Sequence, residues 1–307
     1  MSLGKRQFLI GGLPIGLGLS FSATLQAQQG SQVRTGGAGN PFRRPPPPTR
    51  QAKTIVLFQS PEGHPNAIAS DEHGRGLWIA EEQSNPDRTN CNAYLVDWKG
   101  SVLKKIATPG ANTSGMAQGG GFLWMGSDGR GQEHSGIYQI DIESGDIVAK
   151  HQHPLSPSLS SITSSTHGIA WDDDHKKLWV SVDRLDVLMR IDPASWTPDL
   201  AFRLDTTYFA RHHGIGYDKG FIWDASYKSD PTTGKSSGHT EGHGGLARYD
   251  ATSGETVLNV DFVTGSADPH AVTVHGGVIY CCDSGLHPGW PDNDSPTTGA
   301  IFRVELI

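Results

Sequence analysis

The strongest constraint on the fold is an internal repeat that begins near residue 54 and continues to the C-terminus. Each of five units opens with a short segment of small and apolar residues, and a second apolar segment centred on an aromatic residue follows about ten residues later. The opening segments are Ala67-Ile68-Ala69, Gly115-Met116-Ala117, Gly168-Ile169-Ala170, Gly214-Ile215-Gly216 and Ala271-Val272-Thr273. The aromatic segments are Leu77-Trp78, Leu123-Trp124, Leu178-Trp179, Ile222-Trp223 and Ile279-Tyr280. Successive units begin 46 to 57 residues apart, a period that indicates a repeat architecture.

Each unit contains further strand-like segments. The third segments are Tyr94–Asp97, Tyr138–Asp141, Met189–Asp192, Ala247–Asp250 and Ile301–Val304. Turn residues such as Ser144-Gly145 then lead to a fourth segment such as Ile147–Ala149. Four short strands in each unit are the organisation of a β-propeller blade. The 39 Gly and 19 Pro residues argue against a coiled coil or a helical bundle.

The two ends of the repeat region complement each other. The fifth unit stops at Ile307 after three strands, whereas the apolar segment Thr54–Phe58 precedes the first unit and belongs to none. Placed at the outer edge of the last blade, that segment completes four strands and covers an exposed edge. We therefore predict an all-β fold: a five-bladed β-propeller over residues 54–307, closed by the N-terminal strand at about residues 54–58. The repeated Trp is expected to pack between blades.

Residues 1–53 differ in composition from the repeat. Met1–Ala27 resembles an export signal peptide, with basic residues before the apolar stretch Phe8–Leu19 and small residues at its end. An uncleaved membrane anchor is the alternative, but the stretch is short and rich in Gly. Residues 28–53 include Pro45–Pro48 and are predicted to form a disordered linker.

The segment Gly4–Leu9 resembles the twin-arginine export motif, with Lys5 in place of its first arginine. We therefore expect a periplasmic or secreted protein, exported by a bacterial route, with no integral membrane span in its mature form.

The net charge of −7 conceals an asymmetry. Residues 1–53 hold seven Lys and Arg and no acidic residue, which leaves 18 basic and 32 acidic residues, or −14, for residues 54–307. A body with this charge repels polyanions, so nucleic acid is excluded as a partner. We expect a monomer that acts on a small molecule.

One polar position recurs just before the innermost strand of each unit. Its occupants are Asn66, Ser114, His167, His213 and His270. Because the inner strands of a propeller surround one channel, we expect these side chains to converge at its mouth. Three imidazoles with open coordination positions favour a catalytic divalent metal, namely zinc, iron or copper, with calcium as a further choice. The alternative is a repeat that merely prefers a polar residue at this turn.

The segments after the second strands carry acidic and other polar residues. The acids Glu81, Glu82, Asp128, Asp183 and Asp283 follow the aromatic residue closely. We predict Glu82 and Asp283 to be catalytic, together with His64 at the rim, and ordinary turn chemistry is the alternative for each acid. The predicted substrate-binding residues are Asn66, Ser114, Asp128, His287 and Trp290.

Two further sets of residues, a pair of histidines and the three cysteines, are also candidates for chemistry. His239 and His243 have the spacing of a metalloprotease motif, which requires a helix. Four nearby Gly argue against a helix, and Glu241 is one position too late for the motif. We therefore interpret this segment as a lid over the channel. Cys91, Cys281 and Cys282 are expected to form one disulfide. The alternative is a thiolate metal ligand at Cys281 or Cys282.

Three short segments are similar to those of propeller enzymes of the streptogramin lyase and gluconolactonase-like group. They are His167-Gly168-Ile169-Ala170, Leu178-Trp179-Val180 and Ile191-Asp192. The resemblance covers nearly all of the repeat region and implies the propeller fold. Those relatives have six or seven blades, so their active-site residues do not transfer position by position.

Phosphate-binding glycine motifs and the Gly-x-Ser-x-Gly elbow are absent from the sequence, which argues against nucleotide-dependent and serine-hydrolase chemistry. The sequence therefore predicts an exported, metal-dependent lyase or hydrolase that acts on a small organic molecule at the channel mouth. The first alternative is an iron- or copper-dependent oxidase or oxygenase that uses the same site. The second is a non-catalytic periplasmic binding or scaffold propeller.

Overall fold

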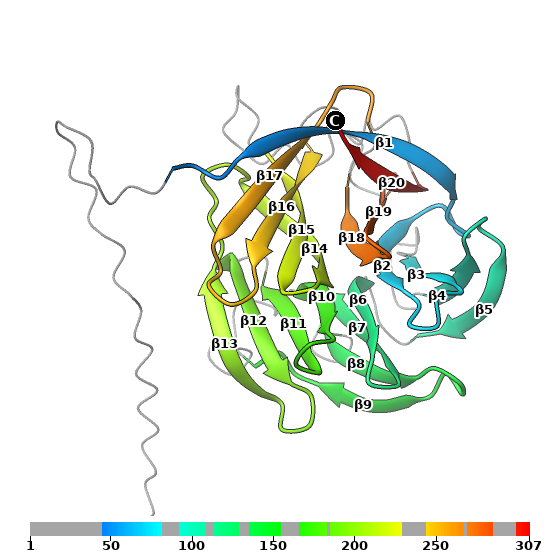
Figure 1. Ribbon diagram of the computed structural model, residues 1–307. Helices are drawn as coiled ribbons and strands as arrows, with labels where there is room; N and C mark the ends of the chain where they lie inside the picture. The colour runs from blue at the N-terminus through cyan, green and yellow to red at the C-terminus, as the bar shows by residue number, and fades with distance from the viewer. Residues whose placement is uncertain are drawn as a thin grey trace, which may run out of the picture. The chain divides into compact units, whose positions relative to one another are not determined.

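The computed structural model describes residues 45–81, 92–108, 113–128, 135–154, 166–182, 185–228, 244–266, 269–284 and 299–307. Within these ranges the twenty regular elements are all β-strands, and they belong to one compact unit, Pro46–Ile307 (Figure 1). The predicted all-β class is therefore confirmed. The described residues include no helix long and apolar enough to cross a membrane.

Three antiparallel sheets each contain four strands that are consecutive in the chain. The first contains β2 (Pro65–Ser70), β3 (Gly76–Glu81), β4 (Asn92–Asp97) and β5 (Val102–Ala107). The second contains β6 (Thr113–Gly119), β7 (Phe122–Asp128), β8 (Ser135–Asp141) and β9 (Ile147–His151). The third contains β10 (Thr166–Asp172), β11 (Lys177–Val182), β12 (Val187–Asp192) and β13 (Thr197–Arg203).

The remaining strands form one eight-stranded sheet in the order β14-β15-β16-β17-β1-β20-β19-β18. One half contains β14 (Arg211–Asp218), β15 (Phe221–Tyr227), β16 (Gly244–Asp250) and β17 (Thr256–Phe262). The other half contains β18 (Ala271–His275), β19 (Val278–Cys282), β20 (Ala300–Leu306) and β1 (Thr49–Gln59). Parallel pairing between β1 and β17 joins the halves.

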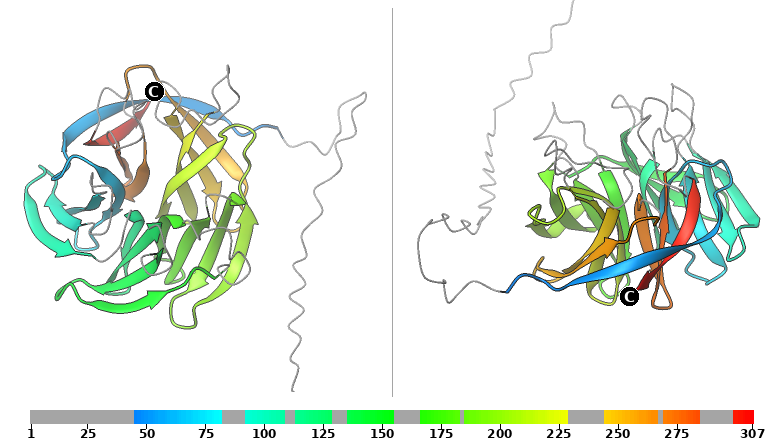
Figure 2. Two further views of the ribbon diagram at one scale, coloured as in Figure 1. Left: turned by 180° about the vertical axis from the view of Figure 1, so that it is seen from behind. Right: turned by 90° about the horizontal axis from the view of Figure 1, so that it is seen from above.

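The N-terminal strand β1 is longer than predicted. It pairs antiparallel with β20 from Ala52 to Gln59, which includes the expected segment Thr54–Phe58. Its first residues, Thr49 to Ala52, pair in parallel with β17, so β1 lies across the edges of both strands (Figure 2). Residues 49–53 are therefore strand and not linker, because they satisfy backbone groups of β17 that would otherwise form an exposed edge.

The first strand of each unit faces the centre of the ring. Strand β6 lies beside β2 and β10, β14 lies beside β10 and β18, and β18 returns to β2. The first strands of all five sequence repeats thus form a closed cycle around one axis, with the later strands of each unit farther out (Figure 1).

Small residues allow the inner strands to approach this closely. A Cβ atom on Gly115 would lie 2.8 Å from the backbone nitrogen of Ile169, and one on Gly168 would lie 2.8 Å from that of Ile215. On Gly214 it would lie 2.6 Å from the Cα atom of Ala271. Ala67 and Ala271 occupy the equivalent position in the other two units. We call these five residues the Gly/Ala ring.

The repeated tryptophans pack between neighbouring sheets, as predicted. Trp78 is fully buried with Leu123 and Met125 of the next sheet, and its indole Nε1 donates to Gln118 Oε1 at 2.9 Å. Trp179 is likewise fully buried, and its indole donates to Asp172 at 3.2 Å. Burial of these large side chains supplies much of the apolar contact between units.

An aspartate ends the third strand of four units and stabilises the turn that follows. Asp97 Oδ1 accepts hydrogen bonds from the backbone nitrogens of Lys99 and Ser101, both at 2.8 Å. Asp141, Asp192 and Asp250 repeat this pattern. These backbone hydrogen bonds lower the pKa of each carboxyl. The repeated Asp is therefore a turn residue rather than a catalytic one.

Removal of β1 should destabilise the protein far more than removal of the residues before it. A chain that starts at Pro61 exposes the edges of β17 and β20 and should aggregate, whereas a chain that starts at Pro45 keeps both pairings. Thermal melting and light scattering of the two truncations measure the difference. Equal melting temperatures would show that β1 does not close the ring.

Gly168→Ala should weaken the contact between inner strands. The new Cβ would lie 2.8 Å from the backbone nitrogen of Ile215 and 2.9 Å from the carbonyl oxygen of His213. Urea denaturation should show a loss of about 1–3 kcal/mol in the free energy of unfolding. A variant as stable as the wild type would mean that the inner strands can move apart enough to accommodate a Cβ atom at residue 168.

Candidate functional site

Three imidazoles lie together at the end of the ring where the inner strands begin. His167 is in β10, His213 is in β14, and His270 directly precedes β18. The ring centroids of His167 and His213 are 4.7 Å apart, and those of His213 and His270 are 3.9 Å apart. All three side chains are at least nine-tenths buried. We call them the histidine cluster.

The Gly/Ala ring explains why the cluster is so tight. Each histidine directly precedes a Gly or Ala of that ring, so the close approach of the backbones extends to the imidazoles. The backbone N–H of Gly214 donates to the carbonyl oxygen of His270 at 3.1 Å, and this bond connects neighbouring inner strands. The hydroxyl of Tyr227 donates to the carbonyl oxygen of Pro269 at 2.5 Å and holds the segment before His270.

An arginine contacts the middle imidazole. Nη2 of Arg211 lies 3.0 Å from Nε2 of His213. A guanidinium only donates hydrogen bonds, so Nε2 of His213 must accept, and the imidazole is neutral with its proton on Nδ1. The cluster thus contains at least one neutral imidazole beside a permanent positive charge.

A buried carboxylate holds the backbone of His213. Asp224 Oδ1 accepts from the backbone N–H of His213 at 3.3 Å, and Asp224 Oδ2 accepts from Nδ1 of His212 and from the hydroxyl of Ser226. His212 is only 1% exposed, so it supports Asp224 from the interior and does not face solvent. His212 contacts Asp224 and Tyr249, whereas the ring of His213 contacts those of His167 and His270.

Asn66 and Ser114 are buried at the equivalent positions of the other two units. The hydroxyl of Ser114 donates to the carbonyl oxygen of Thr166 at 2.9 Å, which links β6 to β10. The hydroxyl proton of Ser114 is therefore used in a structural hydrogen bond and is not free to be donated to a substrate. His64 is half-buried, and its backbone N–H donates to Glu81 Oε2 at 2.8 Å.

The buried acid at this end of β3 is Glu81. Its carboxylate accepts from the backbone nitrogens of Glu62 at 3.1 Å and of His64, and burial raises its pKa to about 7. Asp283 is fully buried after β19. Burial raises the pKa of the preceding Cys282, and the charges of Asp283 and Glu81 add to this rise. The sequence ranked Glu82 above Glu81. The structure pairs Glu81 with Pro65, which directly follows His64, and this register is not visible in the sequence.

Several predicted residues lie outside the described ranges. Glu82, Cys91, His287 and Trp290 do so, as do Asp183, His239, Glu241 and His243. Asp128 ends β7, and only its backbone is described. Their predicted roles stay predictions.

The two described cysteines, Cys281 and Cys282, are free thiols, so the expected single disulfide is wrong, because each of its three possible pairings needs one of them. Consecutive residues of β19 face opposite sides: Cys281 packs with Val272 and Phe302, and Cys282 packs with Ile68 and Ile301. Burial raises the pKa of both thiols. Buried neutral thiols are poor metal ligands, which also argues against the thiolate alternative.

The histidine cluster does not fit a shared metal ion as its side chains lie. Imidazoles that share a metal at about 2.0–2.1 Å splay around the ion, whereas the rings of His213 and His270 pack against each other. The lone pair of His213 Nε2 already accepts from Arg211, whose charge repels a cation. In the described part of the chain, no three His, Cys, Asp or Glu side chains are arranged to hold a metal.

Comparison with known proteins identifies similar folds. Glutaminyl cyclase of Myxococcus xanthus matches with a TM-score of 0.55 at 12% identity, covering 85% of this chain and 98% of that one. A luciferin-regenerating enzyme matches with a TM-score of 0.50 at 12% identity, covering 82% and 94%. Streptogramin B lyase matches with a TM-score of 0.45 at 15% identity, covering 81% and 67%. No family model and no curated protein sequence matches this chain.

These likenesses concern the fold alone, since all the identities are low. The two matches with TM-scores of 0.50 or more agree with the closed cycle of inner strands. The chain is therefore an all-β protein of β-propeller type, and its chemistry has to be argued from its own residues.

Glu81→Gln should remove a pH dependence of stability. Because the pKa of Glu81 is raised to about 7 from 4.5, the folded state keeps a proton that the unfolded chain releases between these pH values. Relative to the variant, the wild type should lose up to about 3 kcal/mol of unfolding free energy as the pH rises through this interval. Urea denaturation at about pH 4.5 and about pH 8 measures this loss, and parallel profiles would contradict it.

Proposed function

We propose that this chain is an enzyme that acts on a small organic molecule at the histidine cluster. The observation that carries the proposal is the contact of three buried imidazoles from three neighbouring inner strands, one of them held neutral by an arginine. Clustering of titratable groups at the mouth of a rigid ring is typical of functional sites.

Neutral imidazole both accepts and donates protons near neutral pH. In an elimination or a hydrolysis, one imidazole of the cluster removes a proton from the substrate or from water. The resulting imidazolium, or a neighbouring imidazole, returns a proton to the leaving group. Asp224 holds the backbone that carries His213, and Arg211 favours a substrate that bears or develops negative charge beside it. Asp283 and His64 remain proposed contributors from the rim.

A metal-dependent form of this activity is the second candidate, because three imidazoles are a donor set that zinc, iron or copper accepts. It requires His213 to turn away from Arg211, and calcium would need oxygen donors. The oxidase or oxygenase alternative depends on such a metal.

We also propose that the protein is exported through Met1–Ala27 and acts as a monomer. The eight-stranded sheet then comprises two blades, β14–β17 and β18–β20 with β1, which makes five blades in all. The antiparallel pairing of β1 with β20, which gives the last unit its fourth strand, supports this count.

The test uses 4-nitrophenyl acetate, an activated ester that imidazole sites cleave. His167→Asn, His213→Asn and His270→Asn should each lower the rate about 100-fold, the effect of losing a positioned acid or base. The controls are His73→Asn and His175→Asn, whose rings are largely or half exposed, and both should keep the wild-type rate. Melting temperatures verify that the variants fold.

Metal analysis of the same proteins separates the two candidates. Stoichiometric zinc, iron or copper that all three cluster variants lose would favour the metal-dependent form. A wild-type rate no higher than that of the cluster variants, with no bound metal, would overturn the enzyme proposal in favour of a binding or scaffold protein.

A further inference from the structure

A cavity lies at the end of the ring opposite the histidine cluster, where the inner strands end. Its volume is about 330 Å³, and all five inner strands contribute to its wall. The histidine cluster precedes the Gly/Ala ring, whereas this cavity begins directly after it, so about two residues, or roughly 7 Å of strand, separate the two. The close backbone contact at the Gly/Ala ring lies between them.

The base of the cavity is apolar. Side chains from successive inner strands line it, namely Ile68, Met116, Ile169, Ile215 and Val274. The volume and this lining suit the hydrocarbon part of a small organic molecule.

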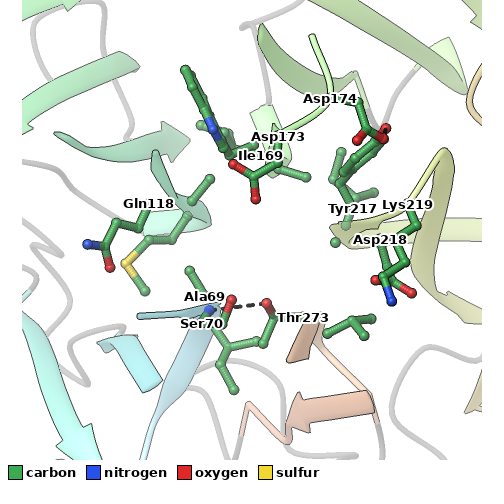
Figure 3. A pocket seen from close by; sticks show the side chains of 18 residues that line it. Ala69, Ser70, Gln118, Ile169, Asp173, Asp174, Tyr217, Asp218, Lys219 and Thr273 are labelled. Atoms are coloured by element: carbon green, nitrogen blue, oxygen red, sulfur yellow. Dashed lines mark hydrogen bonds between the residues drawn. The ribbon is translucent and has the colours of Figure 1, made fainter. Parts of the chain in front are cut away.

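Charge is distributed unevenly around the rim. Figure 3 shows Asp173, Asp174 and Asp218 along one arc, with Lys219 beside Asp218. Gln118 lies on the opposite side, and on the remaining arc the backbone N–H of Ser70 donates to Thr273 Oγ1 at 3.1 Å. Two lysines accompany the three aspartates, namely Lys219 and the exposed Lys176, which lies 3.5 Å from Asp173, so the acidic arc keeps an excess of one negative charge.

Two aromatic rings belong to the same wall, and both are held in place. Trp171 packs on the backbone of Gly119 and Gly120 so closely that a Cβ atom on Gly119 would lie 2.1 Å from the indole. The hydroxyl of Tyr217 donates to Asp174 Oδ2 at 2.5 Å, which fixes this ring and carboxylate together. Aromatic faces beside carboxylates attract organic cations through the ring quadrupole and through charge.

We propose that this cavity binds a small organic cation, an amine or quaternary ammonium with an apolar body. The apolar base takes the hydrocarbon part, and the arc of Asp173, Asp174 and Asp218 takes the positive head beside Trp171 and Tyr217. The acidic charge of residues 54–307 favours the approach of such a ligand. This site is separate from the histidine cluster and does not depend on the activity proposed there.

Isothermal titration calorimetry with three probes of similar size tests the chemistry. Cyclohexylammonium should bind at least tenfold more tightly than cyclohexanol, and cyclohexanecarboxylate should not bind. The titrations are done at about 0.15 M salt, so that diffuse surface attraction is screened. Equal affinity for the amine and the alcohol, or no amine binding at millimolar concentration, would overturn the proposal.

Variants of the full chain test the location. Asp173→Asn with Asp218→Asn should weaken cyclohexylammonium binding about tenfold, and Trp171→Leu should weaken it several-fold. Asp146→Asn, an exposed acid on an outer turn, is the matched control and should bind as the wild type does. Unchanged binding in the double variant would show that the cation binds elsewhere. The same double variant should keep the wild-type rate of ester cleavage, which separates this test from that of the histidine cluster.

Discussion

The close backbone approach of the five inner strands is the constraint on which the rest of the structure depends. At Gly115, Gly168 and Gly214 a Cβ atom would collide with backbone atoms of the next inner strand, so only glycine allows the strands to meet. Burial of the repeated tryptophans between sheets supplies the apolar contact that keeps the sheets around this centre. Strand β1 then prevents the ring from opening, because it pairs with both β17 and β20.

The chemistry at one end of the ring follows from this packing. The histidines sit one residue before the glycines and the alanine, so strands that nearly touch force their imidazoles into contact. Arg211 contacts Nε2 of His213, and Asp224 of the neighbouring strand β15 accepts from the backbone N–H of His213. As the side chains lie, the contact with the guanidinium disfavours a metal ion at Nε2 of His213.

The opposite end of the ring holds the cavity. Its rim is built from the turns after the inner strands, which carry Asp173, Asp174 and Asp218, and apolar residues of those strands line it. The three imidazoles and this acidic and aromatic cavity therefore share one axis. The Gly/Ala ring lies between them.

The sequence by itself determined the repeat, the four strands of each unit, the closing strand and the shared position of the three histidines, because strand periodicity and turn residues are local signals. Contacts between units were decided only by the tertiary structure. Glu81 is buried beside His64, and Thr49–Ala52 lie in β1 and pair with β17 instead of forming part of the predicted linker. Asp173 and Asp218 share one cavity although they lie in different repeats. Such pairings depend on register and on closure of the ring, which bring together side chains that no local pattern connects.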